Sequence, residues 1–488
     1  MLEEMSISDQ FVEEIDVTDF ESVGEELRPK SEEERNWGVG KFATLWMGSV
    51  HNILSYMTVA GFFILGLNSK QVLAAVMTSA VIVSFFYVVN GVASAKYGIP
   101  FTMVLRSVFG VKGSKFPALA RGLIAGVVFF GTQSYVTAGA MDVIFERIFP
   151  GYTSIGGGAT ILGLPIYTAI SFVLVWFITV LLFMGGNKVI DKLGTYASPV
   201  VYLFIIGAAV WAINTAGGFG NVLAYAPDNA KFTIPLFIAC VSALVSNWAG
   251  PIVNTGDFTQ RAKDMKSMAI GLPLGFIFSY VLFAITCVSL FAGTALAFPE
   301  LTSFDIVMSI NQMDSSLAVI ILIMALNIGA FAFVVFGNLY PAGLQLTSLM
   351  PKIFTVKTGG IVTALLGAAI LPWKIVNNLF LFYSFIGSMF GPITGIMLSD
   401  FFINKKQELN LKEIYAPEGS PLSVSYNKQA MIVLIISFSL SMAGAFLPGI
   451  PVLKMLNDFA FFSGLISSFV LYTILTLVQK NHKRGLLK

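Results

Sequence analysis

The stretch Trp46-Met-Gly-Ser-Val-His-Asn-Ile-Leu-Ser-Tyr56 places a histidine beside an asparagine inside an otherwise apolar run. A second apolar run, Ser246-Asn-Trp-Ala-Gly-Pro-Ile-Val-Asn254, is interrupted in a similar way by amides and a Gly-Pro pair. Because proline lacks a backbone donor and clashes with the preceding helical turn, the second stretch predicts a broken helix. A simple kink at the Gly-Pro pair remains the alternative.

The composition around these two stretches is that of an integral membrane protein. Of the 488 residues, 56% are hydrophobic and 11% are charged, whereas globular proteins carry about 25% charged residues. A helix needs about 20 apolar residues to cross the hydrocarbon core of a bilayer. The apolar runs predict an all-α protein with about twelve transmembrane helices, near residues 43–67, 72–96, 118–145, 160–185, 194–215, 232–254, 268–295, 316–346, 358–375, 376–400, 428–448 and 454–479.

The basic residues are concentrated in alternate connections between these runs. By the positive-inside rule, this asymmetry predicts a cell-membrane protein with both termini in the cytoplasm. The basic residues of that side are Lys96, Arg106, Lys112, Lys115, Arg121, Lys188, Lys192, Arg261, Lys263, Lys266, Lys352, Lys357, Lys405, Lys406, Lys412, Lys480, Lys483, Arg484 and Lys488. The acidic, polar start of the chain does not resemble a cleavable signal peptide, which begins with a basic patch and an apolar core.

The two interrupted runs suggest an internal repeat. In transporters, broken helices at corresponding positions of two halves mark the substrate site, since unwound backbone at membrane depth survives where it lines a cavity. The first and sixth runs are five helices apart, which predicts two five-helix repeats followed by two further helices. The predicted parts are a cytoplasmic tail at 1–40, a ten-helix core at 41–402, a cytoplasmic loop at 403–427, two peripheral helices at 428–479 and a cytoplasmic tail at 480–488.

Few polar side chains fall at membrane depth, and most of them are neutral. His51 is the one group among the apolar runs whose unperturbed pKa lies near neutrality, so it is a candidate for substrate binding or proton transfer. A neutral histidine that ties two helices together is the structural alternative. Gln133 offers the paired donors and acceptor that suit a flat heterocycle, and Phe129 and Trp248 offer stacking faces, although plain packing would also explain the aromatic rings. Together with Asn338, these groups favour a neutral polar substrate.

Several further stretches resemble the nucleobase:cation symporter-1 family, which includes hydantoin, allantoin and cytosine permeases. Lys96-Tyr-Gly-Ile-Pro-Phe101 resembles the family's loop after the second helix, and Gly391-Pro-Ile-Thr-Gly-Ile-Met-Leu-Ser-Asp-Phe-Phe402 is similar to its tenth-helix signature. Asp257-Phe258-Thr259 with Arg261 resembles the segment after the sixth helix. The resemblance is in register from about residue 37 to 415, and the opening stretch is most similar to allantoin permeases. It implies the LeuT-type 5+5 inverted-repeat fold with two additional C-terminal helices.

The resemblance also implies a substrate site between the first, third, sixth and eighth helices. The positions it implies for substrate contact are Asn52, Phe129, Gln133, Asn247, Trp248 and Asn338. Phe129 departs from the hydantoin symporter, which has tryptophan there, so the substrate preference is expected to differ.

A cation site is implied by the same register, at Gly48, His51, Gly329, Ala332 and Phe333. The family's sodium site draws hydroxyls from the eighth helix, which alanine and phenylalanine cannot supply. The departure favours protons as the coupling ion, with sodium or uncoupled exchange as alternatives. No cofactor is expected, and no cysteine metal site or disulfide.

The sequence therefore predicts a secondary active transporter that imports a neutral nucleobase or related ring compound, such as allantoin, hydantoin, uracil or cytosine, by alternating access. The alternatives are an uncoupled facilitator, a carrier of another ring compound such as a vitamin, a channel or a membrane-embedded enzyme. The expected partners are the small-molecule substrate and the lipid bilayer, with no nucleic acid and no obligate protein partner. Ser384, Gly387 and Gly391 in the tenth helix are candidates for gating or for close helix packing.

Overall fold

The computed structural model describes residues 27–301 and 304–486, with the backbone alone described at 46, 48–49, 187–200 and 481–486. The described chain is helical apart from a two-strand hairpin, β1 (Thr160–Ile161) with β2 (Leu164–Pro165). The helices of the first half are α3 (Val39–Val50), α4 (Ile53–Ile64), α5 (Ser69–Tyr97), α6 (Phe101–Phe109), α7 (Lys115–Leu119), η2 (Ala120–Ala125), α8 (Gly126–Ile148), η3 (Tyr152–Ser154), α9 (Ile166–Met184), α10 (Gly186–Thr215) and α11 (Phe219–Ala224).

The second half of the chain is built in the same way from long helices joined by short ones. Its helices are α12 (Ile234–Asn247), α13 (Ala249–Val253), α14 (Gly256–Thr259), α15 (Met265–Ala297), α16 (Ile306–Asn311), α17 (Ser316–Phe333), η4 (Val334–Leu339), α18 (Tyr340–Leu349), α19 (Val356–Ala369), α20 (Trp373–Val376), α21 (Leu379–Leu398), η5 (Ser399–Asn404), α22 (Leu411–Tyr415), α23 (Lys428–Phe446), α24 (Pro451–Asp458) and α25 (Ala460–Leu486).

The lengths of the helices match a protein that crosses the membrane many times. Eight described helices are long and apolar enough to span a bilayer, and four shorter apolar helices accompany them. Three of the long spans contain a π-helical segment, η2 before α8, η4 between α17 and α18, and η5 after α21. Such wider turns in otherwise α-helical spans are often found at functional sites.

The first and sixth spans are both interrupted in the middle of the bundle. Between α3 and α4 the backbone leaves the helical region, with φ −84° and ψ 66° at His51 and an extended conformation at Asn52. The Asn52 side chain then accepts a hydrogen bond from the Ser55 backbone N–H and caps α4. Between α12 and α13 the break falls at Trp248, two residues before Gly250-Pro251. The predicted interruptions are therefore present in both spans.

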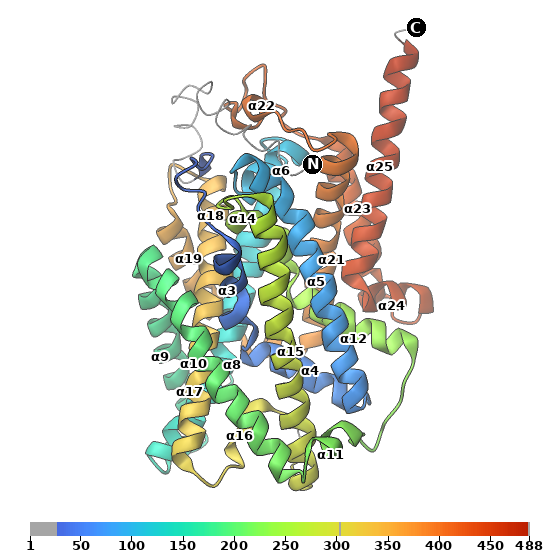
Figure 1. The fold of residues 1–488 in the computed structure, drawn as a ribbon. Helices are drawn as coiled ribbons and strands as arrows, with labels where there is room; N and C mark the ends of the chain where they lie inside the picture. Colours follow the sequence, from blue (N-terminus) through green and yellow to red (C-terminus); the bar gives the residue numbers. More distant parts are fainter. Residues whose placement is uncertain (1–26, 302–303, 487–488) are drawn as a thin grey trace.

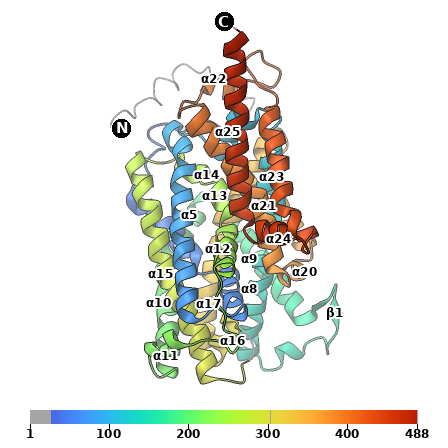
Figure 2. The ribbon, with the colours of Figure 1, turned by 90° about the vertical axis from the view of Figure 1, so that its right-hand side faces the viewer.

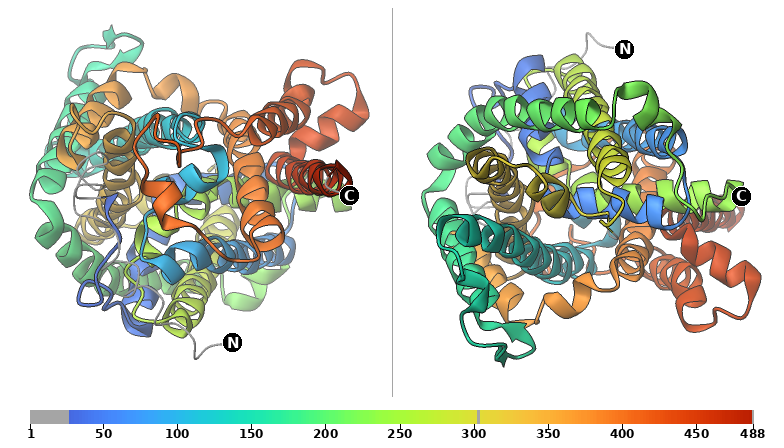
Figure 3. Two further views of the ribbon diagram at one scale, coloured as in Figure 1. Left: turned by 90° about the horizontal axis from the view of Figure 1, so that it is seen from above. Right: turned by 90° about the horizontal axis from the view of Figure 1, so that it is seen from below.

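Two groups of helices, which meet where α3 contacts α17, pack around the middle of the molecule. One group contains α3, α5 and α12–α15, while the other contains α8, α9 and α17–α19; α10 contacts both. Residues 27–37 and the last turns of α25 lie at one end of the bundle, at the top of Figure 1, which we call the terminal end. The β-hairpin projects near the opposite end in Figure 2, and α23–α25 stand at one side of the bundle in Figure 3.

The small residues of α21 lie against α25. A Cβ atom at Gly387 would meet the Phe461 backbone, and one at Gly391 would overlap the Phe461 carbonyl oxygen. Ser384 donates a hydrogen bond to the Asn457 carbonyl at 3.1 Å. These residues thus allow the tenth span to approach its neighbours closely. Close helix packing was one of the two roles, beside gating, that the sequence indicated for them.

Replacing Gly391 with alanine is expected to destabilise the protein, because the new methyl group must push α21 away from α25. The same substitution at Gly139 is a matched control in α8, since a Cβ there meets no atom within 4 Å. Alanine improves helix propensity over glycine by about 1 kcal/mol. The midpoint of thermal unfolding in detergent should therefore fall for Gly391→Ala and hold or rise for Gly139→Ala. Equal shifts in the two variants would contradict the packing role.

Candidate functional site

The break in the first span is held by buried polar side chains. His51 is fully buried, and its Nδ1 lies 2.9 Å from the Tyr56 hydroxyl. The imidazole meets the ring of Tyr202 edge-on at 5.1 Å and that of Phe283 at 5.9 Å. In the described part of the chain, its Nε2 atom has no hydrogen-bond partner. The histidine therefore has one ring nitrogen committed to tyrosine and the other available.

The break in the sixth span is joined to the first one by a hydrogen bond. Asn247 donates through Nδ2 to the Ser55 hydroxyl at 3.1 Å, which connects the last residue of α12 to the first turn of α4. Asn52, 1% exposed, lies at the start of that helix. The structure thus brings together the amides that the sequence assigned to the two interrupted spans.

Trp248 occupies the second break with its indole ring fully buried. Its ring packs edge-on against Phe276 at 5.1 Å, Tyr280 at 6.3 Å and Phe333 at 5.5 Å. Phe333 is one of the positions assigned to the cation, and its side chain instead faces the tryptophan proposed to stack on substrate. The two sets of candidate residues are therefore adjacent at this point.

Gln133 on α8, like Asn327 on α17, is a buried amide for which the described residues provide no hydrogen-bond partner. It is completely buried, yet neither Oε1 nor Nε2 has a hydrogen-bond partner among the described residues. A buried polar group without a hydrogen-bond partner lowers the stability of the fold by about 1–3 kcal/mol. Such a group in a folded protein therefore calls for an explanation, such as a bound ligand. Its helix packs against both α4 and α17, and Phe129, one turn earlier, contacts the ring of Phe382 edge-on at 5.1 Å.

The remaining candidates lie on the eighth span. Asn338 is within η4, 2% exposed, and its Nδ2 has no partner in the part of the chain that the structure describes. Gly329 and Ala332 are buried in the last turns of α17. Gly48 lies in α3, but its surroundings fall outside the described residues. The structure describes no group of three or more histidine, cysteine or acidic residues that would hold a metal ion.

A buried charged network beside this site was missed by the sequence analysis. Arg121 was counted with the basic loop residues, but it is 1% exposed, inside the span Lys115–Ile148. Its Nε donates to the Asn254 side-chain oxygen at 3.0 Å, and its Nη2 donates to the Gly337 carbonyl at 2.6 Å. The Asn254 amide in turn donates to Asp257 at 2.9 Å. These partners replace the hydration of Nε and Nη2, while Nη1 has no hydrogen-bond partner among the described residues.

Asp257 is the acidic member of this network. Its side chain is 1% exposed and accepts hydrogen bonds from Gln345 at 2.9 Å and from the Phe101 backbone N–H at 3.1 Å. Burial raises the pKa of the Asp257 carboxyl to about 6, against the opposing influence of its donors and Arg121. The sequence signal that could have found the network was Arg121, which lies three residues inside the predicted third run.

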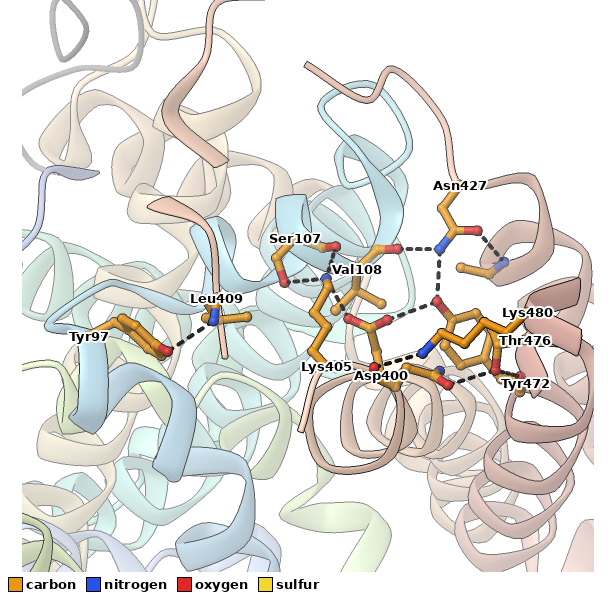
Figure 4. Close-up of polar contacts among 12 residues, drawn as sticks. Tyr97, Ser107, Val108, Asp400, Lys405, Leu409, Asn427, Tyr472, Thr476 and Lys480 are labelled. Carbon is orange, nitrogen blue, oxygen red and sulfur yellow. Dashed lines mark hydrogen bonds and ion pairs between the residues drawn. The ribbon is translucent and has the colours of Figure 1, made fainter. Parts of the chain in front are cut away.

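A second polar cluster lies farther along the tenth span at the terminal end (Figure 4). Lys405 forms a salt bridge with the buried Asp400 at 2.7 Å and also donates to the Ser107 carbonyl oxygen. The Tyr472 hydroxyl donates to Asp400 at 3.0 Å and accepts from Asn427 at 2.8 Å. These contacts connect η5 to α6, to α25 and to the start of α23.

Comparisons with known proteins agree with this architecture. Residues 29–467 match the family described as permease for cytosine/purines, uracil, thiamine, allantoin. A putative allantoin permease of Escherichia coli (strain K12) is 35% identical over 474 residues, covering 94% of this chain and 96% of that protein. The allantoin permease of Bacillus subtilis (strain 168) is 32% identical over 461 residues, covering 93% of both.

The solved structures that are similar show a shared fold. Mhp1, a nucleobase-cation-symport-1 family transporter in a closed conformation with bromovinylhydantoin bound, superimposes with a TM-score of 0.77 at 21% identity, covering 94% of this chain and 96% of that one. A sodium-coupled sialic acid symporter superimposes with a TM-score of 0.62 at 13% identity, covering 95% of each chain. The predicted all-α, LeuT-type fold is confirmed by these neighbours.

Proposed function

Because the chain belongs to the family of permeases for cytosine/purines, uracil, thiamine and allantoin, and is a multi-pass membrane transporter rather than an enzyme, we propose that it imports a neutral ring compound of the allantoin, hydantoin, uracil or cytosine class. Import proceeds by alternating access, with the two interrupted spans exposed first to one side of the membrane and then to the other. Allantoin is the first compound to test, since two relatives above 30% identity are described as allantoin permeases, one of them putative.

The observation that carries this proposal is the unpartnered amide of Gln133. Its oxygen and nitrogen together match the adjacent N–H and C=O groups of a nucleobase or hydantoin ring, so one substrate would satisfy both. Asn338 supplies a further free N–H, and the Trp248 and Phe129 rings offer apolar faces for a flat molecule. Asn52 and Asn247 complete the polar contacts at the two breaks. None of these six side chains is itself charged, which suits a neutral substrate.

The terminal end is proposed to be the cytoplasmic end of the molecule. The segments around α6, α14 and α22 lie at that end with both described ends of the chain (Figure 1). Basic residues occur in or next to these segments, among them Lys112 after α6, Arg261 after α14 and Lys412 in α22. Positive charge in short loops favours retention in the cytoplasm. This orientation would place both termini inside the cell and would make the opposite, hairpin end the entry side for substrate.

Protons are proposed as the coupling ion in preference to sodium. Sodium needs several oxygen ligands, and the eighth-span positions Ala332 and Phe333 offer no hydroxyl, with the Phe333 ring packed on Trp248. The carbonyls of Gly48, His51 and Gly329 would remain as oxygen ligands, and the His51 imidazole is an additional titratable group near them. An uncoupled facilitator, or a carrier of a ring vitamin, is the alternative reading of the same site.

Uptake by proteoliposomes tests these proposals directly. With radiolabelled allantoin, hydantoin, uracil and cytosine, we expect saturable uptake of at least one compound, recovered chemically unchanged inside the vesicles. An imposed inward proton gradient should increase the rate, and an inward sodium gradient should not. Uptake driven by sodium and insensitive to pH would overturn proton coupling, whereas the absence of saturable uptake for the whole set, ring vitamins included, would overturn the proposed function.

A further inference from the structure

The buried network of Arg121, Asn254, Asp257 and Gln345 joins the two packing groups of helices. The helix α14, which contains Asp257, lies towards the terminal end in Figure 1. Asn254 and Asp257 lie on the continuation of the sixth span, which packs with α5 in the first group. Arg121 in η2 and Gln345 in α18 belong to the third and eighth spans of the second group. Each hydrogen bond from Arg121 or Gln345 to this segment therefore crosses from one group to the other.

The network also touches the candidate substrate site. Arg121 donates to the carbonyl of Gly337, the residue before Asn338. Its guanidinium lies against Gly250, where an added Cβ would come within 3.3 Å of Nε, and Gly250 is two residues from Trp248. A shift of Arg121 would therefore displace backbone in both the sixth and the eighth spans. These backbone segments lie next to Trp248 and Asn338, which are proposed to bind substrate.

We propose that Asp257 is the proton-binding group of the transport cycle, and that its protonation weakens the contact between the two helix groups at the terminal end. This inference rests on the proposed function and identifies the residue that would carry its proton coupling. As a carboxylate, Asp257 accepts from Asn254, Gln345 and the Phe101 N–H and balances the charge of Arg121. As a neutral acid it accepts less strongly, and Arg121 then lacks a counter-charge, so the groups separate more easily.

The surroundings of Asp257 support titration of this group in the physiological range. The elements packed around α14 are α5 and α6, and Arg121 and Gln345 reach it from η2 and α18. Arg121 is the charged side chain that acts on Asp257 among the described residues, and Tyr87 of α5 lies near Arg121. Beyond the far end of α14, Arg35 is bonded to the Ala95 and Ala262 carbonyls. Burial without a direct ion pair raises the pKa of Asp257 towards neutrality.

The test is the pH dependence of uptake by the full-length protein in proteoliposomes. For a single group that titrates near the value given for Asp257, uptake by the unaltered protein should fall about 25-fold between about pH 5.5 and about pH 7.5. Asp257→Asn cannot titrate, and we expect its uptake to be independent of pH across that range. Asp142→Asn removes another buried carboxylate, on α8, that accepts a hydrogen bond from Thr168 of α9; it is the control and should keep the slope of the unaltered protein. His51→Gln tests the rival assignment of the proton to the histidine.

A second variant keeps the inference testable if Asp257→Asn does not fold. Gln345→Met removes one donor to the carboxylate and leaves the acid in place. Because that donor favours the charged form, its loss should move the midpoint of the pH profile upward by about one unit. Infrared difference spectra of the carboxyl C=O stretch should show the same titration without any substrate, and the band should vanish in Asp257→Asn.

The outcomes separate this inference from the proposed function. Saturable uptake with an unchanged pH profile in Asp257→Asn would overturn the role of Asp257 and leave the transport of ring compounds standing. If His51→Gln instead loses the pH dependence of uptake, the proton belongs to the histidine, and the proposed role of Asp257 is overturned. If no ring compound is taken up, the proposed function fails, and absence of an Asp257 infrared titration would then overturn the inference independently.

Discussion

Gln133→Leu is expected to reduce the kcat/KM of ring-compound uptake about 100-fold or more. The substitution removes both hydrogen-bonding atoms that the substrate is proposed to meet, and it leaves the polar edge of the substrate unsatisfied in a buried site. The same substitution should raise the stability of the substrate-free protein by about 1–3 kcal/mol, because two buried polar atoms without described partners are replaced by an apolar side chain of similar length. Loss of uptake should therefore accompany a higher unfolding temperature.

The opposite signs of these two effects separate binding from folding. Uptake kinetics and thermal unfolding should both be measured for Gln133→Leu and for Thr132→Val, a neighbour whose hydroxyl bonds to the Val128 carbonyl of its own helix. The threonine variant should change uptake less than about threefold. If Gln133→Leu lowers stability together with uptake, its amide has a structural role and is not reserved for the substrate.

Arg121→Met is expected to destabilise the folded protein by about 3–5 kcal/mol. It removes the donors of the Gly337 carbonyl and the Asn254 side chain and leaves the Asp257 carboxylate buried without its cation. Adding Asp257→Asn to Arg121→Met should recover part of the loss, since the double variant no longer buries an uncompensated charge. Thermal unfolding in detergent measures the cycle of single and double variants.

Arg147→Met is a suitable control for the arginine substitution itself. Arg147 lies at the other end of α8, where it is more exposed and donates to Asn311 and Ser316. The loss of these contacts should cost about 1–2 kcal/mol, well below the cost at Arg121. Equal destabilisation of the two variants, or a double variant no more stable than Arg121→Met, would show that charge compensation does not hold the network together.

The sequence predicted the fold well because membrane-spanning helices are defined by length and apolarity, which can be counted along a chain. The interruptions at His51-Asn52 and near Trp248 were also visible, since amides, glycine and proline within apolar runs conflict with a continuous helix. The family resemblance supplied the proposed substrate-site residues, and their role stays a prediction. The long-range partners could not be assigned: that Asn247 donates to Ser55 depends on how two helices pack, which no local pattern records.

The network of Arg121, Asn254 and Asp257 was not predicted from the sequence, for a different reason. Arg121 lies near the start of a predicted span, where a basic residue ordinarily reaches the aqueous phase and is counted for orientation. Its burial depends on Asn254 and Gly337, which come from the sixth and eighth spans. Asp257 was noted for its resemblance to a family motif, but its environment is set by α6, α14 and α18 together. Such a group can be recognised as buried only when all three segments are placed.

The π-helical segment η4 has a consequence for how this molecule can change over evolution. A turn of this kind holds one residue more than the α-helical turn around it, so removing a single residue would rewind the span and rotate everything after it by about 100°. Asn338 lies inside η4, and Gln345 follows it by two turns. One deletion would thus move a proposed substrate contact, Asn338, and a donor to Asp257, Gln345, away together. Recombination between relatives would therefore have to keep the number of residues in η4 unchanged, whatever side chains surround it.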